Sequence, residues 1–413
     1  MNGIKSDKLA SLRFQARWRD ERAEHTERLF ARKVNFWRDI FPQRLDSALK
    51  GLTPGDRAEL RCEPGELVPA FAAEKLHTLP WKQFTRPTVD GRPLVPRFGR
   101  FYPRGLLGGL PGIHPSNILP FRLVGLEPDS LTADCNHALA RHALDLEAHV
   151  LDLATKQSDT GGQCREWTAE LLDGPGMNGR WHDQPTDFFS GEPFAREATE
   201  PDLEFYRKPR LVPHTDAKAR EVISGIYARL LTPGMEVLDC MSSLHSHLPE
   251  KLELGRVEGL GMNREELAAN DRLTGVTVHD LNQLPELPYP DDSFDAVVCS
   301  VSVEYLCRPF AVFRDVARVL RPGGVFACTF SNRWFPGKAV RIWTELHEFE
   351  RVGLVLEYYL ESGLFTQLET WSERGWPRPW DSSDRYFSRT ACSDPVYAVW
   401  GRLAPTGTPL TRS

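Results

Sequence analysis

Polar residues follow four short apolar runs in the second half of the chain. They occupy positions 239–243, 261–263, 280–282 and 300–305, each directly after such a run. Three of these four turns contain an Asp or Asn, whose side chains can accept or donate hydrogen bonds. Gathered at one edge of a fold, these groups suit the recognition of a nucleoside.

The elements that position these turns follow from the pattern of apolar residues. Residues 217–231 have apolar side chains at helical spacing and stop at a Pro-Gly pair, and residues 310–320 form a similar segment. The apolar runs alternate with these segments, and residues 395–404 form a closing run. This alternation predicts an α/β fold with a doubly wound sheet. In such a sheet the ligand lies over the carboxyl ends of the strands, where the polar turns fall.

The string LPYPDDSFDAVVCSVSVEYL, followed by RVLRPGG, resembles a signature of the class I S-adenosylmethionine-dependent methyltransferases of type 11. The resemblance covers roughly residues 205–404 and implies that family's Rossmann-like fold, a seven-stranded sheet with a reversed final hairpin. It also implies S-adenosylmethionine as the cofactor. By this resemblance Asp280 bonds the adenine amino group, Leu281 lies beside the ring, and Asp239 lies near the methionine moiety.

The first turn departs from the family pattern, because residues 239–247 contain no glycine. Glycines normally let bare backbone approach the ligand closely. The small Ser242 and Ser243 can still allow that approach, and their hydroxyls can contact the ligand carboxylate. Gly261 replaces the family's ribose-binding acid, so Asn263 is the nearest polar candidate. The cofactor-binding residues expected on these grounds are Asp239, Met241, Ser242, Ser243, Asn263, Asp280, Leu281, Asn282 and Ser300.

The strings VLDCMSSLHSHLP and GLGMN also resemble a subgroup of methyltransferase-like proteins, which favours a ligand-competent variant over a degenerate one. The acceptor of the methyl group stays open, as either a small molecule or a protein. Aromatic residues between positions 334 and 395 suit a small apolar or planar acceptor, and core packing explains them equally well.

Two residues are the candidates for catalysis. Tyr305 follows the fourth strand, where a substrate-facing residue would fall. His214 lies in the lead-in, residues 205–216, which folds over the cofactor in the family; surface residues plus a helix N-cap would explain this segment equally well. Alignment of the reactants can supply most of the rate of methyl transfer, so no invariant base is required. No metal site is expected, because the His245–His247 pair has no third ligand at a suitable spacing.

The first half of the chain has no such alternation and predicts an α+β module with an antiparallel sheet and one helix, over residues 1–154. The segments RLDSALKGLTPGDRAEL and LPFRLVGLEPDSLTADCNHALARHALDLEAHVLDL resemble FKBP-type prolyl isomerases of the SlyD group. The resemblance implies an inserted flap, about residues 79–121, that binds unfolded peptide in that group.

Isomerase activity is expected to be reduced or lost. The family's Val-Ile before the helix aligns with Phe41-Pro42, and proline has no N–H to hold a substrate carbonyl. His25 replaces an acid and Leu146 an aromatic residue, while Phe14 and Phe71 retain parts of the pocket. The module is therefore expected to recruit a substrate or assist assembly. The alternative is an FKBP-type isomerase or chaperone with a non-catalytic methyltransferase-like domain.

Composition narrows the remaining classes. Hydrophobic residues make up 41% of the 413, and 51 Lys and Arg against 57 Asp and Glu give a net charge of -6, so neither nucleic acid nor an anionic membrane is an expected partner. No apolar run is long enough to span a bilayer and no signal peptide is visible, which indicates a cytoplasmic protein. Residues 155–204 read as a linker before the methyltransferase-like domain, residues 205–413.

Overall fold

The second half of the chain forms the α/β sheet that its pattern predicts. The computed structural model describes residues 3–89, 91–158, 162–381, 384 and 386–405. The seven strands of this half are β11 (Val237–Cys240), β12 (Val257–Gly261), β13 (Gly275–Val278), β14 (Phe294–Ser300), β15 (Leu320–Phe330), β16 (Phe365–Arg374) and β17 (Val396–Leu403). Their order is β13-β12-β11-β14-β15-β17-β16, and β17 runs antiparallel to both neighbours. The doubly wound sheet with a reversed final hairpin is thus confirmed.

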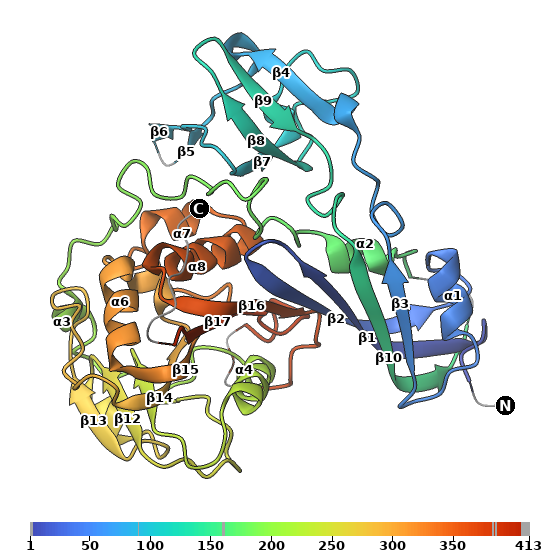
Figure 1. Cartoon of the computed structure of the whole chain (residues 1–413). Coiled ribbons are helices and arrows are strands. Elements are labelled where there is room, and N and C mark those ends of the chain that lie inside the picture. The colour runs from blue at the N-terminus through green and yellow to red at the C-terminus, as the bar shows by residue number, and fades with distance from the viewer. Residues whose placement is uncertain (1–2, 90, 159–161, 382–383, 385, 406–413) are drawn as a thin grey trace.

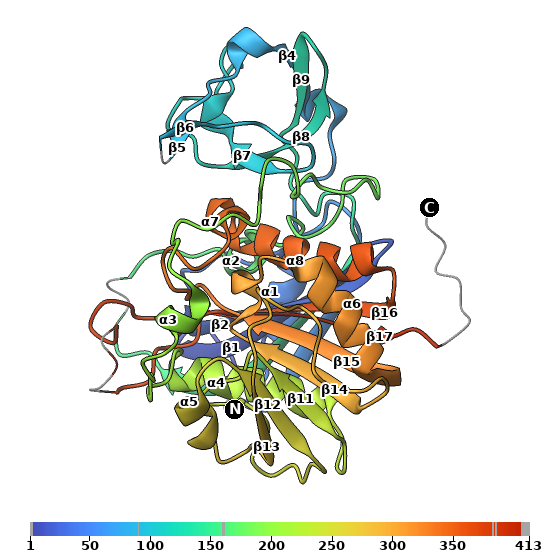
Figure 2. The same ribbon diagram turned by 90° about the vertical axis from the view of Figure 1, so that its left-hand side faces the viewer.

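Helices cover both faces of this sheet (Figure 2). They are α3 (Asp202–Phe205), α4 (Ala217–Leu230), α5 (Arg264–Ala268), α6 (Pro309–Val319), α7 (Arg341–Glu345), α8 (Glu348–Ser362) and the 3₁₀ turn η4 (Val303–Tyr305). The predicted apolar stripe of α4, including Ile223 and Ile226, is buried against one face, while α6 and α8 pack together on the other. Asp216 caps α4 by accepting from the backbone N–H groups of Lys218 and Ala219.

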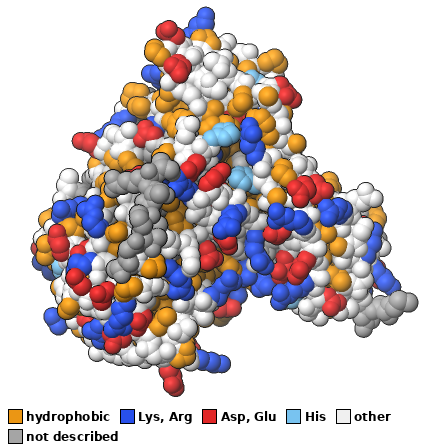
Figure 3. Space-filling view, viewed as in Figure 1, with side chains coloured by type: hydrophobic (Ala, Val, Ile, Leu, Met, Phe, Trp, Pro, Cys, Tyr) orange, Lys and Arg blue, Asp and Glu red, His pale blue; other side chains and the backbone are white. Residues whose placement is uncertain are grey.

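The N-terminal half contains the antiparallel sheet and single helix expected of it. These elements are β1 (Lys8–Arg19), β2 (Ala23–Asn35), α1 (Gln43–Leu49), β3 (Arg57–Cys62) and β10 (Leu144–Thr155). Ion pairs such as Arg61–Asp145 and Arg57–Glu147 lie on the solvent side, where basic and acidic side chains are interspersed (Figure 3). The other side is apolar and buries Phe14 and Leu146.

A second sheet lies at the top of the molecule in Figure 1 and contacts the α/β half, where the buried Arg100 pairs with Glu350 at 3.0 Å. It is inserted between β3 and β10 and is wider than the predicted flap. Its elements are η1 (Ala73–Lys75), β4 (Leu76–Pro80), η2 (Trp81–Gln83), β5 (Thr88–Val89), β6 (Arg92–Pro93), β7 (Phe101–Pro103), η3 (Arg104–Leu106), β8 (Pro120–Leu126) and β9 (Ser130–Asp134). Four of its strands form one sheet, β4-β9-β8-β7, around a small core that includes Phe121 and Leu131.

The two halves share one continuous sheet of eleven strands, because β2 pairs in parallel with β16. Buried polar side chains line this junction. His25 of β2 stacks on Trp18, with 3.7 Å between ring centres, and its Nδ1 lies 2.8 Å from Thr370 Oγ1 of β16. Ser372 of β16 donates a hydrogen bond to Glu27 of β2. Period-two patterns predict strands but not which strand edges meet, so this junction was not foreseen.

The expected linker is packed along much of its described length. It contains α2 (Trp167–Leu172), whose Trp167 and Leu171 belong to the N-terminal core. Further along, Met177 and Phe188 are buried in the core of the α/β half. The segment therefore connects the two halves as a packed element, because its apolar residues have surfaces to cover on both. None of the helices described is long and apolar enough to cross a membrane.

Candidate functional site

A cavity of about 900 Å³ lies over the carboxyl ends of the α/β strands. This volume is near the top of the range of about 300–1,000 Å³ for small-molecule sites. Loops after β11, β12, β13 and β14 form its floor, and its cover includes residues from 202–216 and 332–336 together with Arg378, Asp381, Asp384 and Tyr386. The predicted residues that line it are Met241, Ser242, Ser243, Asn263, Asp280, Leu281, Asn282, His214 and Tyr305.

Met241 explains how the first loop turns without glycine. Its φ of 59° places it in the left-handed region that glycine usually supplies. The next two serine hydroxyls are committed within the protein: Ser242 donates to Asp239 Oδ2 at 2.5 Å, and Ser243 donates to Glu266 Oε2 at 2.6 Å. The loop thus keeps its bend beside an open cavity. Both hydroxyls donate within the protein, so neither is free to donate to a ligand carboxylate, which is the role predicted for them.

Asp239 does not reach the cavity, which corrects its predicted contact with the cofactor. Its side chain is buried at 1% exposure beneath the first loop. Burial raises its pKa to about 7, against the lowering effect of hydrogen bonds from Ser242 and Ser246. Asp239 therefore positions the loop from below.

Ser300 also lies outside the cavity lining, which corrects a second predicted contact. Its Oγ lies 2.7 Å from the hydroxyl of Tyr227 in α4, so it ties the sheet to that helix. The next residue, Val301, does line the cavity and has a φ of 50°, a strained conformation for a β-branched side chain. Strain at both Met241 and Val301 shapes this edge of the sheet.

The missing acid after β12 has a steric cause. A Cβ atom at Gly261 would lie 2.1 Å from the carbonyl oxygen of Ser242, so no side chain fits there. A carboxylate instead comes from α5: Glu266 lines the cavity and accepts from Arg210 N and from Ser243 Oγ, both at 2.6 Å. Sequence reasoning missed Glu266, although its place three residues after the cap Asn263 signals the first turn of a helix.

Two predicted asparagines hold the cover of the cavity in place. Asn263 caps α5 through Oδ1 and donates through Nδ2 to the carbonyls of Tyr206 and Arg207. Asn282 donates to Asp202 Oδ2 at 2.9 Å and accepts from the N–H of Cys307 at 2.8 Å. The side chains of both asparagines are engaged in these contacts, so they hold the residues that cover the cavity. Their predicted contact with the cofactor stays a prediction.

Asp280 and Leu281 lie where the resemblance implies an adenine. Asp280 accepts from the N–H of Asn282 at 2.9 Å through Oδ1 alone, which orients its carboxylate on the cavity wall. Leu281, at 4% exposure, supplies an apolar surface beside it. An acceptor oxygen next to an apolar surface suits the amino edge and face of a purine.

His214 and Tyr305 both contact the same ring. Tyr305 stacks on Phe335 with 5.9 Å between ring centres, and its hydroxyl accepts from the N–H of Phe335 at 2.9 Å. His214 meets Phe335 edge-on at 5.5 Å. Burial lowers the pKa of His214, and the charge of Arg210 acts in the same direction, so the imidazole is neutral at pH 7. Within the described ranges, no three His, Cys, Asp or Glu side chains gather as a possible metal site.

Arg378 fastens the cover to α4. Its buried guanidinium lies 3.3 Å from Asp216, 2.6 Å from Asp384 and 2.9 Å from Asp394. Arg333 pairs with Asp394 at 2.9 Å in the same network. The partners are up to 178 residues apart, so no local sequence pattern predicts them.

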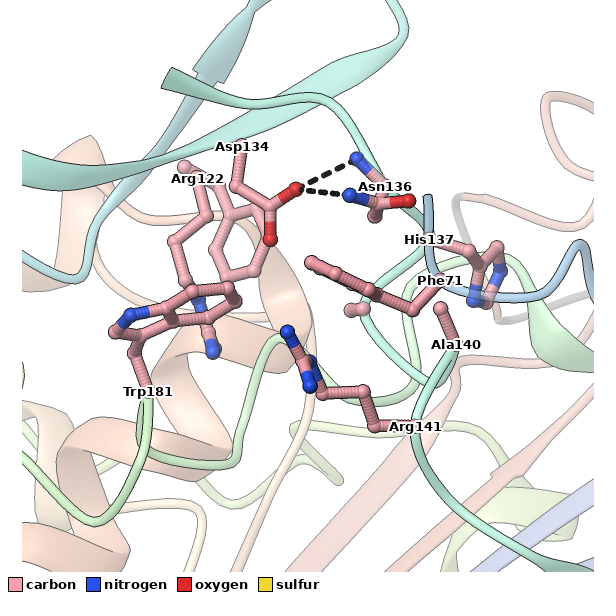
Figure 4. Close-up of a pocket in the computed structure, with 10 residues that line it drawn as sticks. Phe71, Arg122, Asp134, Asn136, His137, Ala140, Arg141 and Trp181 are labelled. Carbon is pink, nitrogen blue, oxygen red and sulfur yellow. Dashed lines mark hydrogen bonds between the residues drawn. The ribbon is translucent and has the colours of Figure 1, made fainter. Parts of the chain in front are cut away.

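A second cavity lies between the inserted sheet, the N-terminal module and the packed linker (Figure 4). Its lining includes the charged side chains of Asp134 and Arg122 and the rings of Phe71 and Trp181. The guanidinium of Arg141 covers Phe71 at 3.4 Å from the ring centre. This second cavity has a volume of about 20 Å³, which is enough for a water molecule and too small for an organic ligand.

Comparison with known proteins finds similarity in the α/β half of the chain, which contains the large cavity. Residues 243–328 match the family model of a methyltransferase domain. The demethylmenaquinone methyltransferase of Halalkalibacterium halodurans is 36% identical over 80 residues, 18% of this chain and 32% of that protein. The 27-O-demethylrifamycin SV methyltransferase of Amycolatopsis mediterranei is 39% identical over 77 residues, 17% of this chain and 28% of that protein. The chain thus spans about a third of the length of these curated relatives.

Solved structures of similar proteins include an S-adenosylmethionine-dependent methyltransferase from Mesorhizobium loti. It has a TM-score of 0.27 and 17% identity, over 43% of this chain and 96% of that one. Another, from Aquifex aeolicus, has a TM-score of 0.30 and 16% identity, over 49% of this chain and 97% of that one. Residues 243–328 are thus similar to a methyltransferase domain, and the strands around them have the order of a doubly wound sheet with a reversed final hairpin.

The residues of the site fit S-adenosylmethionine, the cofactor that this match implies. The first loop leaves the cavity open, and Asp280 with Leu281 offers an acceptor oxygen beside an apolar surface. Glu266 brings a carboxylate to the edge from which Gly261 excludes one.

Proposed function

We propose that the protein is an S-adenosylmethionine-dependent methyltransferase whose acceptor binds in the same cavity as the cofactor. The observation that carries this proposal is the single volume of about 900 Å³ that is lined by Asp280 and Leu281 and also by Tyr305, Phe335 and His214. One shared space can hold both reactants in line, and alignment supplies most of the rate of such a transfer.

Four residues of the cavity have separate roles in the proposed reaction. The bound cofactor supplies an electrophilic methyl group on its sulfonium. Asp280 accepts the adenine amino group, and Glu266 accepts from a ribose hydroxyl while it holds Ser243. Tyr305, fixed by the N–H of Phe335, orients the acceptor. His214, neutral at pH 7, takes the proton that the acceptor loses.

Binding of S-adenosylhomocysteine by isothermal calorimetry tests the proposal without knowledge of the acceptor. We expect saturable binding, weakened about 10–100-fold in Asp280→Ala because a hydrogen bond to a charged group is lost. Asp271→Asn is the matched control, since Asp271 is exposed near the same edge and does not line the cavity. Absence of binding at millimolar ligand would refute the enzyme proposal.

For residues 1–154 we propose an FKBP-like module that assists assembly instead of catalysing isomerisation. Trp167 and Leu171 of α2 pack in one core with Phe14 and Leu146, which are pocket positions by the resemblance. Arg141 lies over Phe71, a third such position. These contacts support a filled pocket and weigh against the alternative of an active isomerase with a non-catalytic methyltransferase-like domain.

The inserted sheet region carries several accessible apolar groups. Val95, Ile118 and Leu119 are 66%, 85% and 55% exposed, which supports a contact with unfolded peptide. A proline-peptide isomerisation assay on the full chain separates the roles: we expect no turnover above the uncatalysed rate. Turnover at the rate of an active FKBP would overturn the assembly role.

A further inference from the structure

Arg210 stands out among the cations that line the large cavity. Arg333 and Arg378 each have a carboxylate partner within 3.3 Å. Arg220 has no carboxylate partner among the described residues, but it donates to the carbonyl of Thr215 at 2.6 Å and none of its nitrogens is both buried and unpartnered. Arg210 has no carboxylate within ion-pair distance among the residues that the structure describes, and its guanidinium donates to the carbonyl of Phe205 at 3.1 Å. Nη1 of Arg210 is buried and has no hydrogen-bond partner within the described ranges.

The nearby carboxylate does not satisfy this charge. Glu266 Oε1 accepts from the backbone N–H of Arg210, and Oε2 accepts from Ser243. A buried donor without a partner costs about 1–3 kcal/mol, and more when it is charged. A ligand with an anionic oxygen would therefore supply the hydrogen-bond acceptor that the described residues do not provide to Nη1 of Arg210.

Aromatic rings hold the guanidinium in place. Its carbon lies 4.4 Å from the ring centre of Phe205, 5.2 Å from that of Phe335 and 5.7 Å from that of Tyr206. Stacking of this kind fixes the plane of a guanidinium and leaves its N–H edge for a planar carboxylate or a phosphate. Because Tyr305 also stacks on Phe335, this anion site lies on the acceptor wall of the cavity.

We propose that the methyl acceptor is a small aromatic acid whose carboxylate or phosphate is bound by Arg210 while its ring packs against Tyr206, Tyr305 and Phe335. This inference rests on the proposed methyltransferase function and narrows its acceptor. It gives Arg210 a specificity role that is distinct from the cofactor-binding role proposed for Asp280.

The test uses the full chain saturated with S-adenosylhomocysteine and titrated with three probes of similar shape. They are 4-hydroxybenzoate, its neutral counterpart 4-hydroxybenzamide, and phenyl phosphate. We expect one or both anionic probes to bind at least about tenfold more tightly than the amide, and the preferred anion separates the carboxylate from the phosphate source. Equal affinities, or no measurable binding of any probe, would overturn the proposal.

Arg210→Met is the matching variant, since it keeps an unbranched side chain between the rings and removes the charge. It should lose the preference for anions while its affinity for S-adenosylhomocysteine stays within about twofold. Arg207→Met is the control, because Arg207 lies in the same segment but is exposed and paired with Glu204. A tenfold loss of S-adenosylhomocysteine affinity in Arg210→Met would instead assign Arg210 to the cofactor's carboxylate and overturn the proposal. Failure of the wild-type chain to bind S-adenosylhomocysteine would be the separate failure of the methyltransferase function.

Discussion

Two surfaces of this molecule differ in what occupies them. Over the α/β sheet the cavity is about 900 Å³, and Asp280 and Arg210 face it with hydrogen-bonding capacity left over. On the apolar side of the N-terminal sheet, where the proposed FKBP-like module would have its pocket, α2 packs Trp167 and Leu171 into the core. The contrast shows that competence for a ligand depends on free space and uncommitted polar groups as well as on the scaffold.

Removal of the large side chain from α2 is the strongest way to test this comparison. Trp167→Ala should lower the free energy of unfolding by about 3–5 kcal/mol, because it leaves a cavity in the N-terminal core. Urea denaturation measures the change, with Trp37→Ala as the control because Trp37 is 63% exposed. Equal small effects in the two variants would show that α2 does not fill the N-terminal site.

Asp239, the buried acid beneath the first loop, provides a test of the α/β half of the comparison. The pKa of Asp239 is raised from 3.8 to about 7, so the folded state holds a proton that the unfolded chain releases between these values. This contribution to stability is present at pH 4 and is lost as the pH rises through 7. Asp239→Asn should therefore gain about 1.4 kcal/mol or more over the wild type at pH 8, the free energy of one pKa unit, and little at pH 4.

Thermal or urea unfolding at the two pH values measures this difference. Asp271→Asn serves as the control, since it removes an exposed carboxylate near the same edge. The same gain at both pH values would contradict the raised pKa of Asp239, and with it the account of how the loop is held.

The smallest expected effect concerns the bend itself. A left-handed conformation costs a non-glycine residue about 1–2 kcal/mol, so Met241→Gly should raise the free energy of unfolding by about 1 kcal/mol after the entropy of glycine is counted. Met262→Gly, outside the left-handed region, should lower it instead. If Met241→Gly is as destabilising as Met262→Gly, the strain assigned to the loop is absent.

Much of the α/β fold could be predicted because its signals are local. Residues 217–231 predict α4 to within one residue, and the apolar run 293–303 contains β14. The parallel pairing of β2 with β16 could not be predicted, because alternation marks a strand without naming its neighbour. The local signal for α2 is weak: it is the short stretch EWTAELL, and the Gly- and Pro-rich sequence around it has little periodicity.

The candidate site was predictable where position along a strand decides it. Asp280, Leu281 and Tyr305 follow their strands and line the cavity as expected. Asp239 lies within β11 and Ser300 is the last residue of β14. Asp239 is buried beneath the first loop and Ser300 contacts Tyr227 of α4, so neither lines the cavity, which spacing alone does not reveal. Glu266 reaches the cavity because of the orientation of α5, and the Arg378 network joins residues that are far apart in the chain. Neither can be predicted from a local sequence pattern.

Hydrogen–deuterium exchange with and without S-adenosylhomocysteine tests the contrast between the two regions most directly. The backbone amides of residues 240–243 and 280–282 should exchange several-fold more slowly with the ligand present, while those of residues 167–172 should be unchanged. Protection confined to the N-terminal module, or no protection at the carboxyl edge of the sheet, would contradict the claim that the glycine-free loop encloses a working cofactor site.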